Sequence, residues 1–600
     1  MPRSLLLVLT SILTATHGRR CKNIPGDADW PTRAEWGAFN ETLGGRLIAT
    51  VPLASVCHSE GAFAQYNETA CAALQEEWNR PQVLFETPAA IMPAWFQESC
   101  NPFSPASQPC ELGNYASYSI NVAGVEDVVA GIKFSKTHNV RLVVKNTGHD
   151  LSGKSTGKGG LSLWMHNVKG TEIIPEYESS YYKGPAIKVG AGVLGLEAYQ
   201  AADSAGYRLV GGNCPSVGVA GGYTQGGGHS SLSSQYGLAA DNVLEWEVVT
   251  ASGEHIIATP RSNEDLYWAL SGGGGGTYAV VISMTARLHK DGPIGGGYLT
   301  FDNLTAGSDA FWQAVGLFNQ RLPAMIDEGG NTIAYSLVNS AFGIYNLAAP
   351  GRSGEEVRAL LEPFLADLEA LGIPYNCSTH ESPTFLEQLR RDYGPFPNGP
   401  FETSAIIGSR LISRAVLLEP TDNEALTKVL RDTTSGNEFV MLMQALDVGA
   451  GGPLSVAPVA NNAVLPAWRA TAVQAIVTAP WDWTVPRPEM ERRQYVLTNE
   501  ITPALEAVTP GSGAYLNEGN FAQKNWQEEF YGANYRRLLE IKEKYDPDSL
   551  FYATAAVGSE NWEDADGRLC TTDAASICSA RYDSQGYSLL GASTGPLYAV

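Results

Sequence analysis

The segment 211–228, GGNCPSVGVAGGYTQGGG, constrains this chain more than any other stretch. It contains eight glycines and one cysteine, Cys214, which has no obvious partner at a disulfide spacing. Glycine-dense backbone lets a ligand approach closely and turns N–H groups toward anions, but ordering it costs conformational entropy. A large, partly anionic ligand lying against the segment offsets that cost. We therefore expect a ligand-binding wall that carries a thiol.

Two further loops in the same part of the chain have a similar character. Residues 145–155, KNTGHDLSGKS, follow the apolar run VRLVV, and residues 272–276 are five consecutive glycines. We expect the backbone N–H groups of 145–155, with Ser152 and Ser155, to cradle a pyrophosphate. One such loop alone is typical of a tight turn. Three of them, one with a thiol, favour a large cofactor.

His149 lies inside the loop 145–155. A lone histidine is more often a surface or satisfied core residue than a functional one. Its place in a phosphate-type loop suggests that an imidazole nitrogen meets an electrophilic carbon of the cofactor. No HExxH motif and no zinc-spaced Cys/His cluster is present, so metal binding is disfavoured.

Length and charge narrow the class of protein. Six hundred residues exceed the size at which one hydrophobic core keeps growing, so we expect at least two domains. A formal net charge of −23 disfavours nucleic acid and anionic membrane surfaces as partners. With 44% hydrophobic and 17% charged residues, the chain is typical of a folded protein rather than a disordered one.

The N-terminal residues predict secretion. Arg3 precedes an apolar run over residues 5–13, which is too short to span a bilayer and is typical of a signal peptide at 1–18. A buried N-terminal helix is the alternative. No later stretch offers a membrane span. Four N-x-[ST] sequons agree with an extracellular location: Asn40, Asn67, Asn303 and Asn376.

Nine cysteines in an oxidising compartment leave one unpaired. Close spacing predicts the disulfides Cys100–Cys110, Cys570–Cys578 and Cys57–Cys71. Cys21 and Cys377 remain as the fourth pair, and Cys214 is the odd thiol.

Hydrophobic periodicity predicts an α+β fold. Residues 19–111 read as an irregular arm held by disulfides. Residues 112–291 hold the glycine loops between a helix at 125–138 and strands at 140–144, 186–189 and 243–250. Residues 292–509 predict an antiparallel sheet covered by helices, with strands at 332–338, 439–446 and 470–477 and helices at 355–371 and 488–508. Residues 510–600 form the last region.

At this level of detail four blocks resemble a known family. They are KNTGHDLSGKS, GNCPSVGVAGGYTQGGG, GLAADNVLEWEVVTASGE and DLYWALSGGGGGTYAVV. All are similar to segments of secreted fungal berberine bridge enzyme-like enzymes, within the vanillyl-alcohol oxidase/p-cresol methylhydroxylase (PCMH) flavoprotein superfamily. The resemblance implies a PCMH-type FAD-binding domain at 112–291, a substrate domain at 292–509, and a return to the FAD domain at 510–600.

The resemblance also implies how the cofactor is held. FAD would be attached bicovalently, through its 8α-methyl to His149 and through C6 to Cys214, which accounts for the odd thiol. Further cofactor contacts would come from Asn146, Thr147, Gly148, Asp150, Ser155, Val217, Gly218, Gly222, Gly228, Val281, Tyr515 and Asn517.

Glu518 is the candidate catalytic residue. GAYLNEGN, residues 513–520, resembles the family's returning strand, in which many relatives place a tyrosine base directly after the asparagine; here that position is Glu518. A carboxylate beside a flavin serves as general base if burial raises its pKa toward the working pH. A structural role for Glu518 is the alternative, with Asp447, Tyr345 or Tyr335 as the base.

The leading functional hypothesis is an FAD-linked oxidase. It oxidises an alcohol-type small molecule (an oligosaccharide, phenolic or secondary metabolite) by hydride transfer to flavin N5, and O2 becomes H2O2. Val217 falls where valine accompanies oxygen access in the family. The alternatives are a biosynthetic flavoprotein that catalyses oxidative cyclisation or desaturation, and a flavin-bearing protein with little turnover. We expect a monomer.

Overall fold

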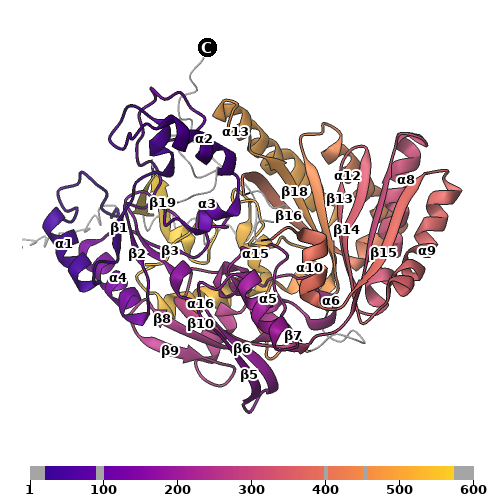
Figure 1. Cartoon of the computed structure of the whole chain (residues 1–600), viewed down its shortest axis with the longest axis horizontal. Coiled ribbons are helices and arrows are strands. Elements are labelled where there is room, and N and C mark those ends of the chain that lie inside the picture. The colour runs from indigo at the N-terminus through magenta and orange to yellow at the C-terminus, as the bar shows by residue number, and fades with distance from the viewer. Residues whose placement is uncertain (1–19, 90–99, 397–402, 450–456, 566, 573–600) are drawn as a thin grey trace, which may run out of the picture. The chain divides into compact units, whose positions relative to one another are not determined.

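The computed structural model describes residues 20–89, 100–396, 403–449, 457–565 and 567–572 (Figure 1). The described residues form two compact units, one within 23–559 and one from 20–22 with 560–565 and 567–572. The signal peptide expected at 1–18 lies outside the described residues. No helix among the described residues is long and apolar enough to cross a membrane.

The smaller unit brings residues 20–22 together with a segment that begins at residue 560. The strands β19 (Trp562–Ala565) and β20 (Arg568–Thr571) form an antiparallel hairpin. Cys21 forms a backbone bridge with Cys570, and the two cysteines share a disulfide with a Cα–Cα distance of 3.9 Å. The predicted pairs Cys570–Cys578 and Cys21–Cys377 are therefore wrong. Cys578 lies outside the described residues, and Cys377 is a free thiol on another strand.

The reason is that closeness in sequence is a weak guide when an antiparallel bridge brings distant backbones together. Cys21 and Cys570 are 549 residues apart along the chain. The amide of Lys22 also donates to the carbonyl of Leu569 at 2.8 Å, which keeps the two backbone segments in register beside the disulfide.

The N-terminal arm is more regular than predicted. It contains the helices α1 (Arg33–Thr42), α2 (Glu68–Glu77) and α3 (Pro81–Phe85). Thr32 caps α1 in a reciprocal capping box with Glu35, and Asn67 caps α2 by accepting from the amide of Ala70. These capping signals explain why helices form where apolar periodicity is weak.

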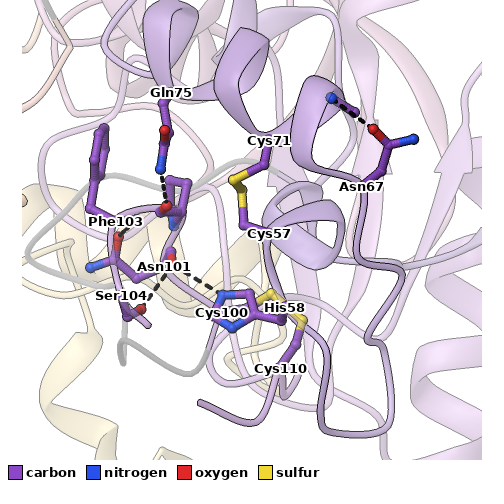
Figure 2. Close-up of a disulfide and its surroundings, with 12 residues drawn as sticks. Cys57, His58, Asn67, Cys71, Gln75, Cys100, Asn101, Phe103, Ser104 and Cys110 are labelled. Carbon is purple, nitrogen blue, oxygen red and sulfur yellow. Dashed lines mark hydrogen bonds between the residues drawn. A yellow bond between two sulfur atoms is a disulfide. The ribbon is translucent and has the colours of Figure 1, made fainter. Parts of the chain in front are cut away.

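The predicted disulfides Cys57–Cys71 and Cys100–Cys110 are both present in this arm (Figure 2). The side chain of His58, which follows Cys57, is buried, and its two ring nitrogens are 2.7 Å and 3.0 Å from the carbonyl oxygens of Gln108 and Asn101. The disulfides and this histidine replace the hydrophobic core that a short irregular segment cannot build.

Two sheets form the first half of the larger unit. A four-stranded sheet has the order β1-β2-β4-β3, with β2, β4 and β3 parallel; a five-stranded antiparallel sheet has the order β5-β6-β10-β8-β9. The strands of the first are β1 (Leu47–Ala49), β2 (Tyr118–Asn121), β3 (Leu142–Lys145) and β4 (Leu161–Trp164). Those of the second are β5 (Thr171–Glu178), β6 (Lys183–Gly190), β8 (Val243–Thr250), β9 (His255–Ala258) and β10 (Ala279–Arg287).

The helices of this half are α4 (Val125–His138), α5 (Gly195–Ser204), α6 (Ser233–Tyr236) and α7 (Glu264–Leu270); the short strands β7 (Tyr207–Arg208) and β11 (His289–Lys290) pair with each other. Buried apolar residues of α4 pack on the four-stranded sheet in the same core as the five-stranded one. The loops 145–155 and 272–276 follow β3 and α7, so both lie where regular structure ends.

The second half is a seven-stranded antiparallel sheet of order β15-β12-β14-β13-β17-β18-β16. Its strands are β12 (Ile294–Asp302), β13 (Thr332–Leu337), β14 (Ala341–Pro350), β15 (Tyr375–Ser382), β16 (Ala405–Ser413), β17 (Val440–Ala445) and β18 (Thr471–Pro480). Its helices are α8 (Gly307–Asp327), α9 (Gly354–Ala370), α10 (Phe385–Tyr393), α11 (Arg414–Leu418), α12 (Pro420–Thr434), α13 (Arg487–Val496) and α14 (Thr502–Val508).

One face of this sheet is covered by helices, as predicted. Figure 1 shows α8, α9 and α12 on the same side of it. Met441 and Met443 of β17 and Val473 of β18 pack into the core beneath these helices. Because side chains alternate along a strand, the intervening residues of β17 and β18 point to the other face. That other face meets the first half.

The C-terminal return is a loop rather than the predicted strand. Residues 513–520 contain no strand and turn at Leu516 and Asn517, where the amide of Glu518 donates to the carbonyl of Tyr515 at 3.0 Å. The loop is held between β16 and the helix α15 (Trp526–Tyr531), since the Gly513 carbonyl accepts from Leu411 and the Ala514 amide donates to Glu529. The helix α16 (Tyr535–Tyr545) follows.

Candidate active site

A cavity of about 440 Å³ lies between the first half and the uncovered face of the seven-stranded sheet. Nearly all residues predicted to hold the cofactor or act in catalysis line it: Asn146, Thr147, Gly148, His149, Asp150, Ser155, Cys214, Val217, Gly218, Gly222, Val281, Tyr515, Asn517 and Glu518. Gly228 does not line it, but its amide donates to the hydroxyl of Tyr515 at 3.2 Å. The cavity size is in the range of small-molecule sites.

His149 and Cys214 converge on a single hydroxyl. Ser216 Oγ is 2.9 Å from His149 Nε2 and 3.4 Å from Cys214 Sγ. The second ring nitrogen, His149 Nδ1, forms no hydrogen bond within the described part of the chain. When Nε2–H donates to Ser216, Nδ1 carries a lone pair that is free to form a bond. Sequence reasoning missed Ser216, although it lies two residues after the odd cysteine.

The charge state of His149 suits a nucleophile. Burial, reinforced by the nearby ammonium of Lys145, lowers its pKa to about 4, so the imidazole is neutral at ordinary pH. Lys145 is itself fully buried, where desolvation lowers its pKa to about 7. Its Nζ donates to the carbonyls of Leu84 and Thr87 at 2.8 Å and 2.9 Å, which ties the N-terminal arm to this loop. Burial raises the pKa of the Cys214 thiol.

Three amides of the loop 145–155 are not free for a phosphate, contrary to expectation. The carboxylate of Asp150 accepts from the backbone N–H groups of Ser152, Lys154 and Ser155, so these donors are already satisfied. The spacing of GHDLSGKS, residues 148–155, matches the P-loop pattern GxxxxGK[ST]. However, no helix follows Ser155 and the next element is β4, so the strand–loop–helix context of a P-loop is missing.

Lys154 is the cation that sequence reasoning overlooked. It lines the cavity, and its Nζ lies 3.7 Å from the position that a Cβ on Gly274 would take. The ammonium therefore lies between the loops 145–155 and 272–276, where it can pair with an anionic group. Burial lowers the pKa of Lys154, and the carboxylate of Asp150 opposes that shift.

The glycine loops leave room for a ligand and pack closely on each other. A Cβ added at Gly222 or Gly276 would meet no atom within 4 Å, and both residues line the cavity. A Cβ on Gly226 would instead collide with the amide of Asn517, which donates to the Gly222 carbonyl at 2.9 Å. Glycine is therefore needed at 226 for close contact with the C-terminal loop.

Two buried acceptors in the cavity wall have no donor within the described residues. They are Asn146 Oδ1 and Gln225 Oε1. Leaving a buried acceptor unpaired costs about 1–3 kcal/mol, so these oxygens are suited to N–H or O–H groups of a bound molecule. The backbone carbonyl of Gln225 also accepts from the amides of Gly272 and Gly274, both at 2.9 Å. These bonds join the segment 211–228 to the loop 272–276.

Glu518 is held by two side chains at the cavity wall. Its Oε1 is 3.1 Å from His229 Nε2, and its Oε2 accepts from Gln474 Nε2 at 2.7 Å. Sequence reasoning missed both partners. His229 directly follows the glycine segment 211–228, and this adjacency is a signal that could have identified it. Gln474 had no signal, because it comes from β18, far away in the sequence.

The three alternative candidates for the base differ in whether they line the cavity. Tyr345 lines the cavity, and its hydroxyl accepts from Gln444 at 3.0 Å. Asp447 is outside the cavity wall and pairs with Arg414 at 3.2 Å. Tyr335 is buried in the core beneath the helices. Asp447 and Tyr335 are therefore wrong as candidates.

Tyr515 stays protonated beside Glu518. Burial, with the carboxylate of Glu518 in addition, raises the pKa of Tyr515. Its hydroxyl accepts from the Asn517 amide at 2.7 Å as well as from Gly228. Tyr515 and Asn517 thus position the loop that carries Glu518.

Comparison with known proteins agrees with this arrangement. Residues 116–259 match the family model of an FAD binding domain, and residues 514–558 match the model described as "Berberine and berberine like". The chain is 48% identical over 582 residues to the VAO-type flavoprotein oxidase VAO615 of Thermothelomyces thermophilus, covering 95% of this chain and 100% of that protein. It is also 48% identical over 576 residues to the bifunctional decalin synthase calF of Penicillium decumbens, covering 94% and 99%.

Solved structures show the same fold. The VAO-type flavoprotein MtVAO615 from Myceliophthora thermophila C1 superposes with a TM-score of 0.88 at 47% identity, over 92% of this chain and all of that one. The glucooligosaccharide oxidase of Acremonium strictum shares the fold alone, with a TM-score of 0.62 at 20% identity over 74% of this chain and 91% of that one.

An FAD-binding domain joined to a sheet-and-helix substrate domain defines a flavoprotein oxidoreductase. The chain belongs to the VAO-type, berberine bridge enzyme-like FAD-linked oxidoreductases. The residues of the cavity fit FAD. Lys154 suits its pyrophosphate, the unpaired acceptors suit its N–H and O–H groups, and His149 and Cys214 suit attachment to its ring.

Proposed function

We propose that the protein is an oxidase with FAD bonded to both His149 and Cys214, and that it converts an alcohol to a carbonyl compound. The observation that carries this proposal is the shared contact of His149 and Cys214 with Ser216, in the wall of the cavity that Glu518 also lines. When bound, FAD would supply a two-electron acceptor for hydride from the substrate carbon, with O2 as the final acceptor and H2O2 as its product.

The remaining chemistry is proton transfer and orientation by the chain. Glu518 accepts the proton of the substrate hydroxyl as the adjacent carbon loses hydride. Hydrogen bonds from His229 and Gln474 hold one carboxylate oxygen each, so the carboxylate keeps a fixed orientation. The protonated phenol of Tyr515 keeps the loop in place and does not compete for the proton.

Oxygen reactivity tests the oxidase assignment. Val217 lines the cavity, and we expect Val217→Ile to slow reoxidation of the reduced protein by 10-fold or more, because a larger side chain obstructs O2. Stopped-flow absorbance after anaerobic reduction measures this rate, and anaerobic reduction itself serves as the control that should not change. A wild-type protein that reoxidises in air only over minutes contradicts the proposal.

A second candidate has a specific observation in its favour. The relative from Penicillium decumbens is named a bifunctional decalin synthase. The same hydride step in this chain would then start an oxidative cyclisation or desaturation. Mass spectrometry of the product distinguishes the two, since simple oxidation yields a carbonyl and cyclisation yields a new ring.

We also propose that the protein is secreted. The three disulfides among the described residues suit an oxidising compartment, and the sequon asparagines Asn67 and Asn376 are exposed. In a fungal host we expect the protein in the medium, and an endoglycosidase should increase its electrophoretic mobility. Retention inside the cell without glycan is the contradicting result.

A further inference from the structure

The wall that faces the cavity from the seven-stranded sheet changes from polar to apolar along its strands. On β17 and β18, Gln444 lies opposite Gln474, and the next pair on the same face is Leu442 opposite Ile476. Ile407 of β16 lies opposite Thr478, one step further. Gln444, Leu442, Ile476, Thr478 and Ile407 all line the cavity.

The polar end of this wall is where Glu518 lies. Gln474 donates to Glu518, and Gln444 donates to Tyr345, so the hydrogen-bonding groups gather at one rung of the sheet. From Gln474 to Thr478 the strand advances about 13 Å, at about 3.3 Å per residue. A molecule with its hydroxyl at Glu518 therefore extends over the apolar rungs.

Charge is absent beyond that end. Among the described residues that line the cavity from the seven-stranded sheet and α10, no side chain is charged. We call Ala405, Ile407, Leu442 and Ile476 the apolar plate. A carboxylate or phosphate on the substrate would find no cation there. A sugar would lose its bonds to water at several hydroxyls, and the plate offers no partner for them.

We propose that the substrate is a neutral, largely hydrocarbon alcohol with one hydroxyl at Glu518. Its apolar body lies over the plate for about 10 Å, which corresponds to three residue steps along a strand. This proposal rests on the oxidase function above and names its substrate class. It selects the apolar secondary metabolite from the earlier possibilities and excludes the oligosaccharide.

The test measures how tightly a homologous series of alcohols binds to the holoenzyme. The change in the flavin absorbance spectrum reports the binding. The probes are the straight-chain alcohols from 1-butanol to 1-octanol, with cellobiose and glycerol as polar comparisons. Each buried methylene should strengthen binding roughly 3- to 4-fold. Cellobiose and glycerol should leave the spectrum unchanged at the same concentrations.

Two shape-conserving variants sharpen the test. Leu442→Asn introduces a polar group into the plate and should weaken 1-heptanol binding roughly 10-fold. Thr478→Val, on the neighbouring strand, removes a hydroxyl and should strengthen it roughly 2- to 5-fold. Opposite effects from adjacent positions are not expected from a general loss of folding, and circular dichroism checks the fold of both.

Three results overturn the proposal while leaving the flavin chemistry intact. They are stronger binding of cellobiose than of any alcohol, an affinity that does not rise with chain length, and no perturbation by any probe. A protein that purifies without flavin contradicts the proposed function instead. The alcohol series is then measured by calorimetry on that protein, with the same slope expected.

Discussion

Replacing Glu518 with Gln is expected to slow flavin reduction by roughly 10²–10⁴-fold, the range for loss of a general base. The amide has nearly the same shape and can still face His229 and Gln474, but it cannot accept the proton of the substrate hydroxyl. Anaerobic stopped-flow absorbance of the flavin measures the rate, with the alcohol that binds most tightly in the series above. Substrate affinity should change far less than the rate.

Glu528→Gln is the matched control for this experiment. It makes the same chemical change on the exposed surface of α15, ten residues further along the chain, and flavin reduction should be unaffected. If Glu518→Gln reduces flavin at the wild-type rate, Glu518 is structural. Tyr345 is then the base to test by Tyr345→Phe, since it is the other earlier candidate that lines the cavity.

The second large effect concerns flavin attachment. We expect His149→Ala and Cys214→Ala each to keep yellow flavin in the acid-precipitated pellet through the remaining bond. The double variant should release all of its flavin into the supernatant. The physical reason is that either covalent bond survives denaturation, whereas noncovalent contacts of the loops do not. Absorbance of pellet and supernatant near the flavin maximum measures the distribution.

Cys377→Ala is the matched control, because Cys377 is the other free thiol among the described residues and does not line the cavity. Its flavin should stay entirely in the pellet. Ser216→Ala should lower the covalently bound fraction, since Ser216 orients both attachment residues. Flavin that can be extracted intact from the wild-type protein contradicts bicovalent attachment.

Local chemistry in the sequence was enough to find the two proposed attachment residues, which the structure brings together at the cavity wall. Cys214 and His149 stand out because each interrupts a glycine-rich loop, and glycine-rich backbone has few uses other than close approach to a ligand. The helix at 125–138 and the strand at 243–250 were also predictable, since each has an apolar period that matches its element and coincides with α4 and β8.

Predictions failed where distant segments meet. Cys570 was assigned to the nearest cysteine, whereas an antiparallel bridge brings Cys21 beside it. The return segment 513–520 was expected to be a strand, but bonds to Leu411 and Glu529 hold it as a loop. The amides after His149 seemed free for phosphate, yet the side chain of Asp150 takes three of them.

The sequence by itself therefore determined the cofactor, the family and two residues of the cavity wall, His149 and Cys214, because these are written in contiguous motifs. Only the tertiary structure decided what surrounds Glu518, and the proposed substrate class rests on those surroundings. His229, Gln474 and the apolar plate come from the end of a glycine loop and three separate strands. They become a site because the pairing order of the sheet places alternate side chains on one face, and no local pattern encodes that order.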